Sequence, residues 1–103
     1  MGDKSKGRRV PSHLSKDAKG LWRRLTGEFS IEDEAGIALL TVAMEAFDRM
    51  KSASSAISEH GVLIKDKFGQ LKPNPACAVE RDARSQYLMA LKQLQLDPNS
   101  VGV

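Results

Sequence analysis

The chain has few of the residues that build aromatic cores, disulfides or metal sites. Five of its 103 residues are aromatic, and Cys77 is its single cysteine. One cysteine excludes an internal disulfide and is typical of a reducing compartment. Because aromatic residues are scarce, aliphatic and alanine side chains must fill the core, which favours helices. His13 and His60 make no ligand pair at metal spacing with each other or with Cys77, so no metal site is predicted.

Long apolar runs are missing as well. No stretch approaches the roughly 18 to 20 apolar residues of a membrane span, and the N-terminus has no apolar core of a secretion signal. We therefore expect an intracellular protein without a membrane partner. The chain also lacks phosphate-binding loops, the GxSxG elbow of hydrolases and the HExxH helix of zinc enzymes. No catalytic residue, cofactor or small-molecule substrate is predicted.

Charge is distributed unevenly. Residues 1–30 contain eight Lys/Arg against three Asp/Glu, residues 31–60 contain two against six, and residues 61–103 contain six against four. A basic segment beside an acidic one indicates an anionic partner or attraction between subunits, although a solvated tail is the simpler alternative. Basic arrays of this kind bind nucleic-acid phosphates with little sequence preference. The predicted phosphate-binding residues are Lys4, Lys6, Arg8, Arg9, Lys16, Lys19, Arg23 and Arg24.

One helical domain is predicted for residues 14–98, between a flexible basic arm at 1–13 and a short tail at 99–103. Its first helix is expected from Ser15, the N-cap, to about Glu28, where Gly27 ends it.

Ser30 is then expected to cap a second helix that runs from Ile31 to His60. The acidic run at 32–34 suits the dipole of that helix better than it suits a metal ion. At 1.5 Å per residue such a helix would reach roughly 45 Å, so it would overhang a compact domain and need a neighbouring subunit. A break within residues 51–56, which hold three serines, is the alternative. The predicted subunit interface is Leu39, Val42, Ala46, Met50 and Ile57.

Residues 62–73 are predicted to form a β-hairpin that leans on the helices or on a neighbouring subunit. The prolines that follow favour a sharp corner. Pro75 suits the first position of a third helix, which should reach about Gln95, and Asn74 suits its N-cap. Cys77, in the first turn of that helix, is predicted to be structural.

Four segments in this order carry a family resemblance: PSHLSKDAKGLWRRL, IEDEAGIALLTVAMEAFDRM, ISEHGVLIKDKFGQLKPNPA and LMALKQLQLDP. Over residues 10–98 the chain resembles the small subunit of bacteriophage terminases. It departs from the family pattern at Gln95, where a glycine is usual, and it has no arginine after Pro98.

The resemblance implies a mainly α fold, with three helices and one hairpin, assembled as a homo-oligomeric ring. It implies a non-enzymatic packaging component in the cytoplasm of the bacterial host. Such a component binds viral double-stranded DNA at the packaging-initiation site, presents it to the large terminase subunit and modulates the ATPase and nuclease activities of that subunit.

Two other functions remain open from the residues. A helix-turn-helix regulator would use the short turn between the first two helices, but three carboxylates at the start of the second helix would then face DNA. A scaffold or activator of the large subunit would have no DNA affinity of its own.

Overall fold

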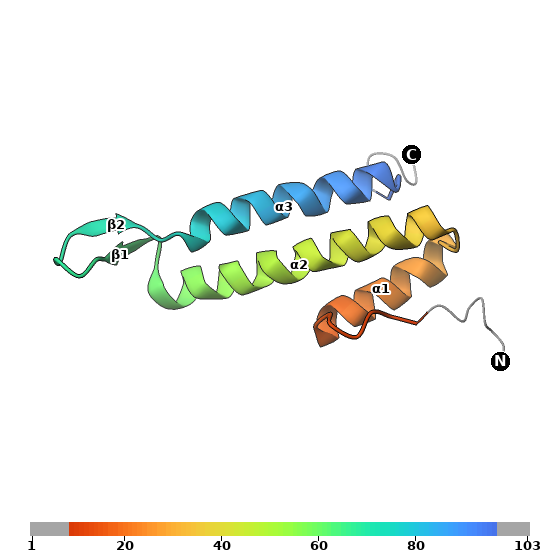
Figure 1. Ribbon diagram of the computed structural model, residues 1–103, viewed down its shortest axis with the longest axis horizontal. Helices are drawn as coiled ribbons and strands as arrows, with labels where there is room; N and C mark the ends of the chain where they lie inside the picture. Colours follow the sequence, from red (N-terminus) through yellow and green to blue (C-terminus); the bar gives the residue numbers. More distant parts are fainter. Residues whose placement is uncertain (1–8, 97–103) are drawn as a thin grey trace.

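The computed structural model describes residues 9–96 as an elongated bundle of three helices with a projecting β-hairpin (Figure 1). In chain order the elements are α1 (Lys16–Phe29), α2 (Glu34–His60), β1 (Leu63–Lys65), β2 (Leu71–Pro73) and α3 (Ala76–Gln93). The Cα radius of gyration is 17.0 Å, larger than the roughly 13 Å expected for a compact chain of this length. The mainly helical fold with a hairpin between α2 and α3 is confirmed.

The turn between α1 and α2 differs from the prediction. Ser15 caps α1 as expected, but the helix continues through Gly27 to Phe29, and Ser30 lies beyond its end with φ of 52°. Asp33 takes the capping role that was assigned to Ser30, because its carboxylate accepts a hydrogen bond from Gly36 N at 2.9 Å. Gly36 is required there, since a Cβ at this position would lie 2.7 Å from Asp33 Oδ1.

Helix α2 is unbroken over 27 residues, so the predicted continuous helix is confirmed. At its end Gly61 has a positive φ of 87° but an extended ψ of 171°, and its N–H still donates to Ile57 O. The overhang that was predicted to need a second subunit is covered in part by α3, which lies along α2 (Figure 1). Small side chains are buried on both helices, including Ala53 and Ala83, and permit close approach.

The largest buried cluster lies where α1 packs on α2. Trp22 is 3% exposed, and Leu40 and Met44 of α2 are completely buried beside it. Phe47 and Tyr87 extend the cluster toward α3, with ring centroids 5.6 Å apart. This packing fixes the buried face of α1, and it therefore also fixes which of its side chains face solvent.

A buried asparagine joins the hairpin to α3. Asn74 is 7% exposed, its Nδ2 donates to Gly61 O at 2.8 Å, and its Oδ1 accepts from Ala76 N at 3.0 Å. The second bond is the capping contact predicted for Asn74, although the regular helix begins at Ala76 and Pro75, which has helical φ and ψ, occupies the position just before it. The strands pair antiparallel, with Ile64 opposite Lys72.

Candidate nucleic-acid interface

Five of the predicted phosphate-binding residues lie within the described part of the chain. Arg9, Lys16, Arg23 and Arg24 are exposed, and Lys19 is partly exposed. Lys4, Lys6 and Arg8 lie outside the described residues. Four of the five therefore stand on α1, and Arg9 precedes that helix.

The helix geometry gathers these cations on one side of α1. At about 100° per residue, Lys16, Lys19 and Arg23 fall within an arc of about 60°. Gly20 and Gly27 lie in or beside the same arc and add no side chain to it. The face is therefore cationic, and the guanidinium of Arg24 reaches it beside Gly20, where a Cβ would lie 3.4 Å from Arg24 Nη1.

The opposite side of α1 is held by the core. Ala18 and Trp22 are buried, and Leu21 and Leu25 pack against the same cluster. Since these side chains point toward α2, rotation of α1 about its axis would expose them. The cationic face is thus directed outward by packing as well as by sequence.

The beginning of α1 is fastened to the middle of α2. Asp48 accepts hydrogen bonds from both the backbone N–H and the hydroxyl of Ser15, the N–H bond being 2.8 Å long. His13 Nε2 lies 2.7 Å from Glu45 Oε2, one turn earlier on α2. Two residues of the predicted arm are therefore attached to the helical body: His13 through Glu45, and Val10 through its packing against the core.

The cations on α1 are available for a ligand. Within residues 9–96, none of Lys16, Lys19, Arg23 and Arg24 makes an ion pair; the described ion pairs lie elsewhere, such as the i,i+4 pair of Arg84 and Glu80. An unpaired cation keeps its full attraction for phosphate and releases counterions from DNA when it binds.

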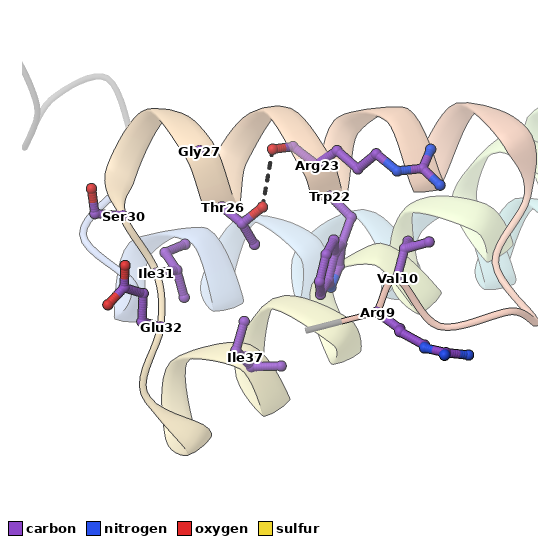
Figure 2. Close-up of a pocket in the computed structure, with 10 residues that line it drawn as sticks. All are labelled: Arg9, Val10, Trp22, Arg23, Thr26, Gly27, Ser30, Ile31, Glu32 and Ile37. Atoms are coloured by element: carbon purple, nitrogen blue, oxygen red, sulfur yellow. Dashed lines mark hydrogen bonds between the residues drawn. The ribbon is translucent and has the colours of Figure 1, made fainter. Parts of the chain in front are cut away.

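An open pocket of about 700 Å³ lies beside this surface, between the N-terminal segment, α1 and the start of α2 (Figure 2). Arg9 and Arg23 belong to its lining, together with apolar side chains that include Ile31 and Ile37. Figure 2 shows the indole of Trp22 directed from α1 toward the first turn of α2. Its buried Nε1 has no hydrogen-bond partner in the described part of the chain.

Sequence reasoning missed this pocket. The spacing of residues marked Trp22 as part of an apolar face, but it contains no signal for the hollow beside the ring. Val10 and Ile31 belong to the lining of the hollow, and both lie in irregular segments whose paths the helix periodicity does not predict.

The family of the chain follows from its match to known proteins. Residues 18–102 match the family model described as phage terminase, small subunit. The chain belongs to this family. The match spans most of the chain, including nearly all of α1 and the whole of α2, the hairpin and α3, and it confirms the resemblance seen in the sequence. No curated protein and no solved structure matches the chain.

In this terminase family member the residues predicted for the subunit interface differ in exposure. Val42 is 50% exposed, whereas Leu39, Met50 and Ile57 are partly buried. Ala46 needs correction, because it is 0% exposed within the single chain and has no surface to offer a neighbour. The reason is that α3 covers part of the stripe that seemed unpartnered in sequence.

Three further features of residues 9–96 concern metal binding, membrane spanning and the single cysteine. This part of the chain contains no group of three or more His, Cys, Asp or Glu arranged to hold a metal ion. None of its helices is long and apolar enough to cross a membrane. Cys77 is partly exposed and unbridged in the first turn of α3.

Proposed function

We propose that this terminase small subunit binds viral double-stranded DNA at the packaging-initiation site through the cationic face of α1 and the basic arm. The supporting observation is the set of outward-facing, unpaired cations on α1, whose direction is fixed by the packing of Trp22 on α2. Contacts of this kind supply affinity and positioning, with little discrimination between sequences.

The subunit then presents the DNA to the large terminase subunit and modulates its ATPase and nuclease activities in the cytoplasm of the bacterial host. Family membership supports this role. The small subunit would itself be non-catalytic. We further propose a homo-oligomeric ring in which Leu39, Val42, Met50 and Ile57 contribute their exposed surface to the contact between subunits.

DNA binding can be tested with a charge-removal variant. Replacing Lys16, Lys19, Arg23 and Arg24 by Ala should weaken binding to every duplex and lower the slope of log affinity against log salt by about one per lost contact. The matched control removes the same number of cations from α2 and α3, and consists of Lys51, Arg81, Arg84 and Lys92 changed to Ala.

Equal losses in the two variants would show that net charge, not the α1 face, governs binding. A parent protein with negligible DNA affinity at low salt would favour the scaffold alternative instead. Native mass spectrometry tests the ring: Val42→Glu should lower the assembled mass while helical circular dichroism persists, and a monomeric parent would exclude the ring.

A further inference from the structure

We propose that the hairpin of β1 and β2 is a second DNA-binding element, a preformed cationic ribbon that enters a groove of the duplex. This inference rests on the proposed function, because it assigns a new contact to the same ligand. Figure 1 shows the hairpin projecting beyond the ends of α2 and α3, away from α1. In this position the helices do not obstruct the hairpin, so it can enter a groove of a DNA duplex.

The hairpin carries three cations and one acid. Lys65, Lys67 and Lys72 are exposed, and none of them makes an ion pair within the part of the chain that the structure describes. The carboxylate of Asp66 is used inside the turn, where its Oδ1 accepts from Phe68 N at 2.8 Å and Gln70 N at 3.0 Å. The lysines therefore remain available for phosphate groups.

An aromatic ring stands at the tip of the ribbon. Phe68 is 76% exposed, and Lys67 Nζ lies 5.4 Å from its ring centroid. In the major groove a phenyl ring can make apolar contact with the methyl groups of thymine, which line the groove floor. The adjoining ammonium group adds a phosphate contact beside that ring.

Hydrogen bonds hold the ribbon in shape at both ends. The turn is closed by Gly69 N donating to Asp66 O at 3.0 Å, and Gly69 adopts a φ of 80° that glycine favours. At the base, Asn74 N donates to Val62 O at 2.8 Å while the Asn74 side chain bonds Gly61. A ribbon fixed in this way loses less conformational entropy on binding than a free loop.

The dimensions fit a groove of DNA. Two paired strands lie about 4.8 Å apart, and the major groove is about 12 Å wide and admits a two-stranded ribbon. A second copy of the chain is the competing occupant, because Leu63 and Leu71 are also exposed on the ribbon. Lysine is depleted from the cores of protein interfaces, and three lysines here favour DNA over protein.

The test distinguishes the contribution of the three lysines to DNA binding from the contribution of the Phe68 ring. Binding of a fluorescent duplex by the full chain is measured over a range of salt concentrations for the parent, for Lys65→Gln/Lys67→Gln/Lys72→Gln and for Phe68→Ala. The triple variant should lower the salt slope by about three. Phe68→Ala should weaken binding up to about tenfold and leave the slope unchanged, because an apolar base contact releases no counterion.

Matched controls remove similar groups from the helices: Lys51→Gln/Arg81→Gln/Lys92→Gln for charge, and Leu88→Ala, which is 54% exposed in the parent, for an exposed apolar side chain. Helical circular dichroism and native mass are recorded for every variant. Affinity and slope equal to those of the parent in both hairpin variants would overturn the proposal.

Three other outcomes have distinct meanings. Loss of assembled mass in the hairpin variants, with DNA affinity per assembly unchanged, would overturn the proposal and assign the ribbon to a second copy of the chain. If only the α1 variant loses DNA affinity and the hairpin variants do not, the proposal for the ribbon is overturned and the proposed function stands. A parent that does not bind duplex DNA overturns both.

Discussion

One carboxylate, that of Asp48, accepts two hydrogen bonds from Ser15, one from its backbone N–H and one from its hydroxyl. The same hydroxyl oxygen accepts from Ala18 N at 3.1 Å and so caps α1. The single hydroxyl proton is directed at Asp48, which leaves a lone pair of the oxygen for the helix. The cap of α1 and its attachment to α2 are therefore one hydrogen-bonded unit.

This unit predicts that substitutions at the two positions are not additive. Ser15→Ala removes the cap and should lower the free energy of unfolding by about 1 kcal/mol. Asp48→Ala should cost about 1–3 kcal/mol, because Ser15 loses the acceptor of its N–H. The loss of stability in the double variant should be smaller than the sum of the two single losses, since each single variant already breaks the bond that the two side chains share. Urea denaturation measures all three.

Asp17→Asn serves as the control for loss of a carboxylate near the same helix end, where Asp17 lies in the first turn without a described bond to α2. It should cost only a few tenths of a kcal/mol through the helix dipole. Full additivity of Ser15→Ala and Asp48→Ala would show that the two side chains act separately.

The sequence predicts much of this fold because its strongest signals are local. Ser15 and Asn74 cap helices whose first turns follow immediately, and the long periodic stretch of α2 outweighs its three serines. These preferences need no knowledge of distant residues, so helix number, hairpin position and the corner before α3 could all be inferred.

The predictions that needed correction depend on contacts between distant segments. Ala46 belongs to an apolar stripe that suits a neighbouring subunit as well as it suits α3, and only the folded chain shows that Ala46 is completely buried within α2's own contacts to the rest of the bundle. For the candidate site, the outward direction of Lys16 and Arg23 follows from helix periodicity. The pocket beside Trp22 does not follow from periodicity, because irregular segments supply part of its lining.

The turn between α1 and α2 yields a second prediction, which distinguishes the observed caps from those inferred by sequence. Asp33→Ala should lower the free energy of unfolding by about 1 kcal/mol, because Gly36 N loses its acceptor. Ser30→Gly should raise it, since Ser30 has a φ of 52° that glycine adopts without strain.

If Ser30 were instead the cap of α2, Ser30→Gly would be neutral or destabilising, and Asp33→Ala would have a small effect. Thermal unfolding followed by circular dichroism ranks the two variants against the parent. Ser58→Gly, within α2, is the control for the general cost of glycine and should lower stability by about 0.5 kcal/mol.

Tyr87 gives a third prediction, about alkaline pH. Burial raises the pKa of Tyr87 above its ordinary value of 10.0. Below pH 10 the phenol is neutral in both the folded and the unfolded chain, so its contribution is complete. As pH rises past 10, the unfolded chain loses the proton first and is favoured, and stability falls until the folded pKa is passed.

Tyr87→Phe should therefore lose less stability than the parent when pH is raised through this range. The free energy of unfolding is measured by urea at several values of pH, and the difference between the two proteins is followed. All other ionisable groups are common to the two proteins, so their contributions cancel in that difference. If the difference in unfolding free energy between the two proteins does not change with pH, burial does not raise the pKa of Tyr87.

The end of α3 provides the last prediction. Gln95 has a φ of 62°, its N–H donates to Lys92 O at 2.9 Å, and Leu96 N donates to Leu91 O at 2.8 Å. These two bonds form a Schellman motif, in which the residue at the position of Gln95 is usually glycine. The departure from the family pattern thus falls where backbone geometry most favours glycine. Gln95→Gly should raise the free energy of unfolding by about 1 kcal/mol, because the left-handed conformation costs glycine little.

Gln93→Gly, two residues earlier at the last residue of α3, has no left-handed φ to relieve and should have the opposite effect, lowering stability by a few tenths of a kcal/mol. Urea denaturation of the two variants beside the parent makes the comparison, and both should keep the slope of the parent with denaturant. If Gln95→Gly were destabilising, the side chain of Gln95 would have to make a contact worth more than its backbone strain, and the usual glycine of the family would then serve some purpose other than ending the helix.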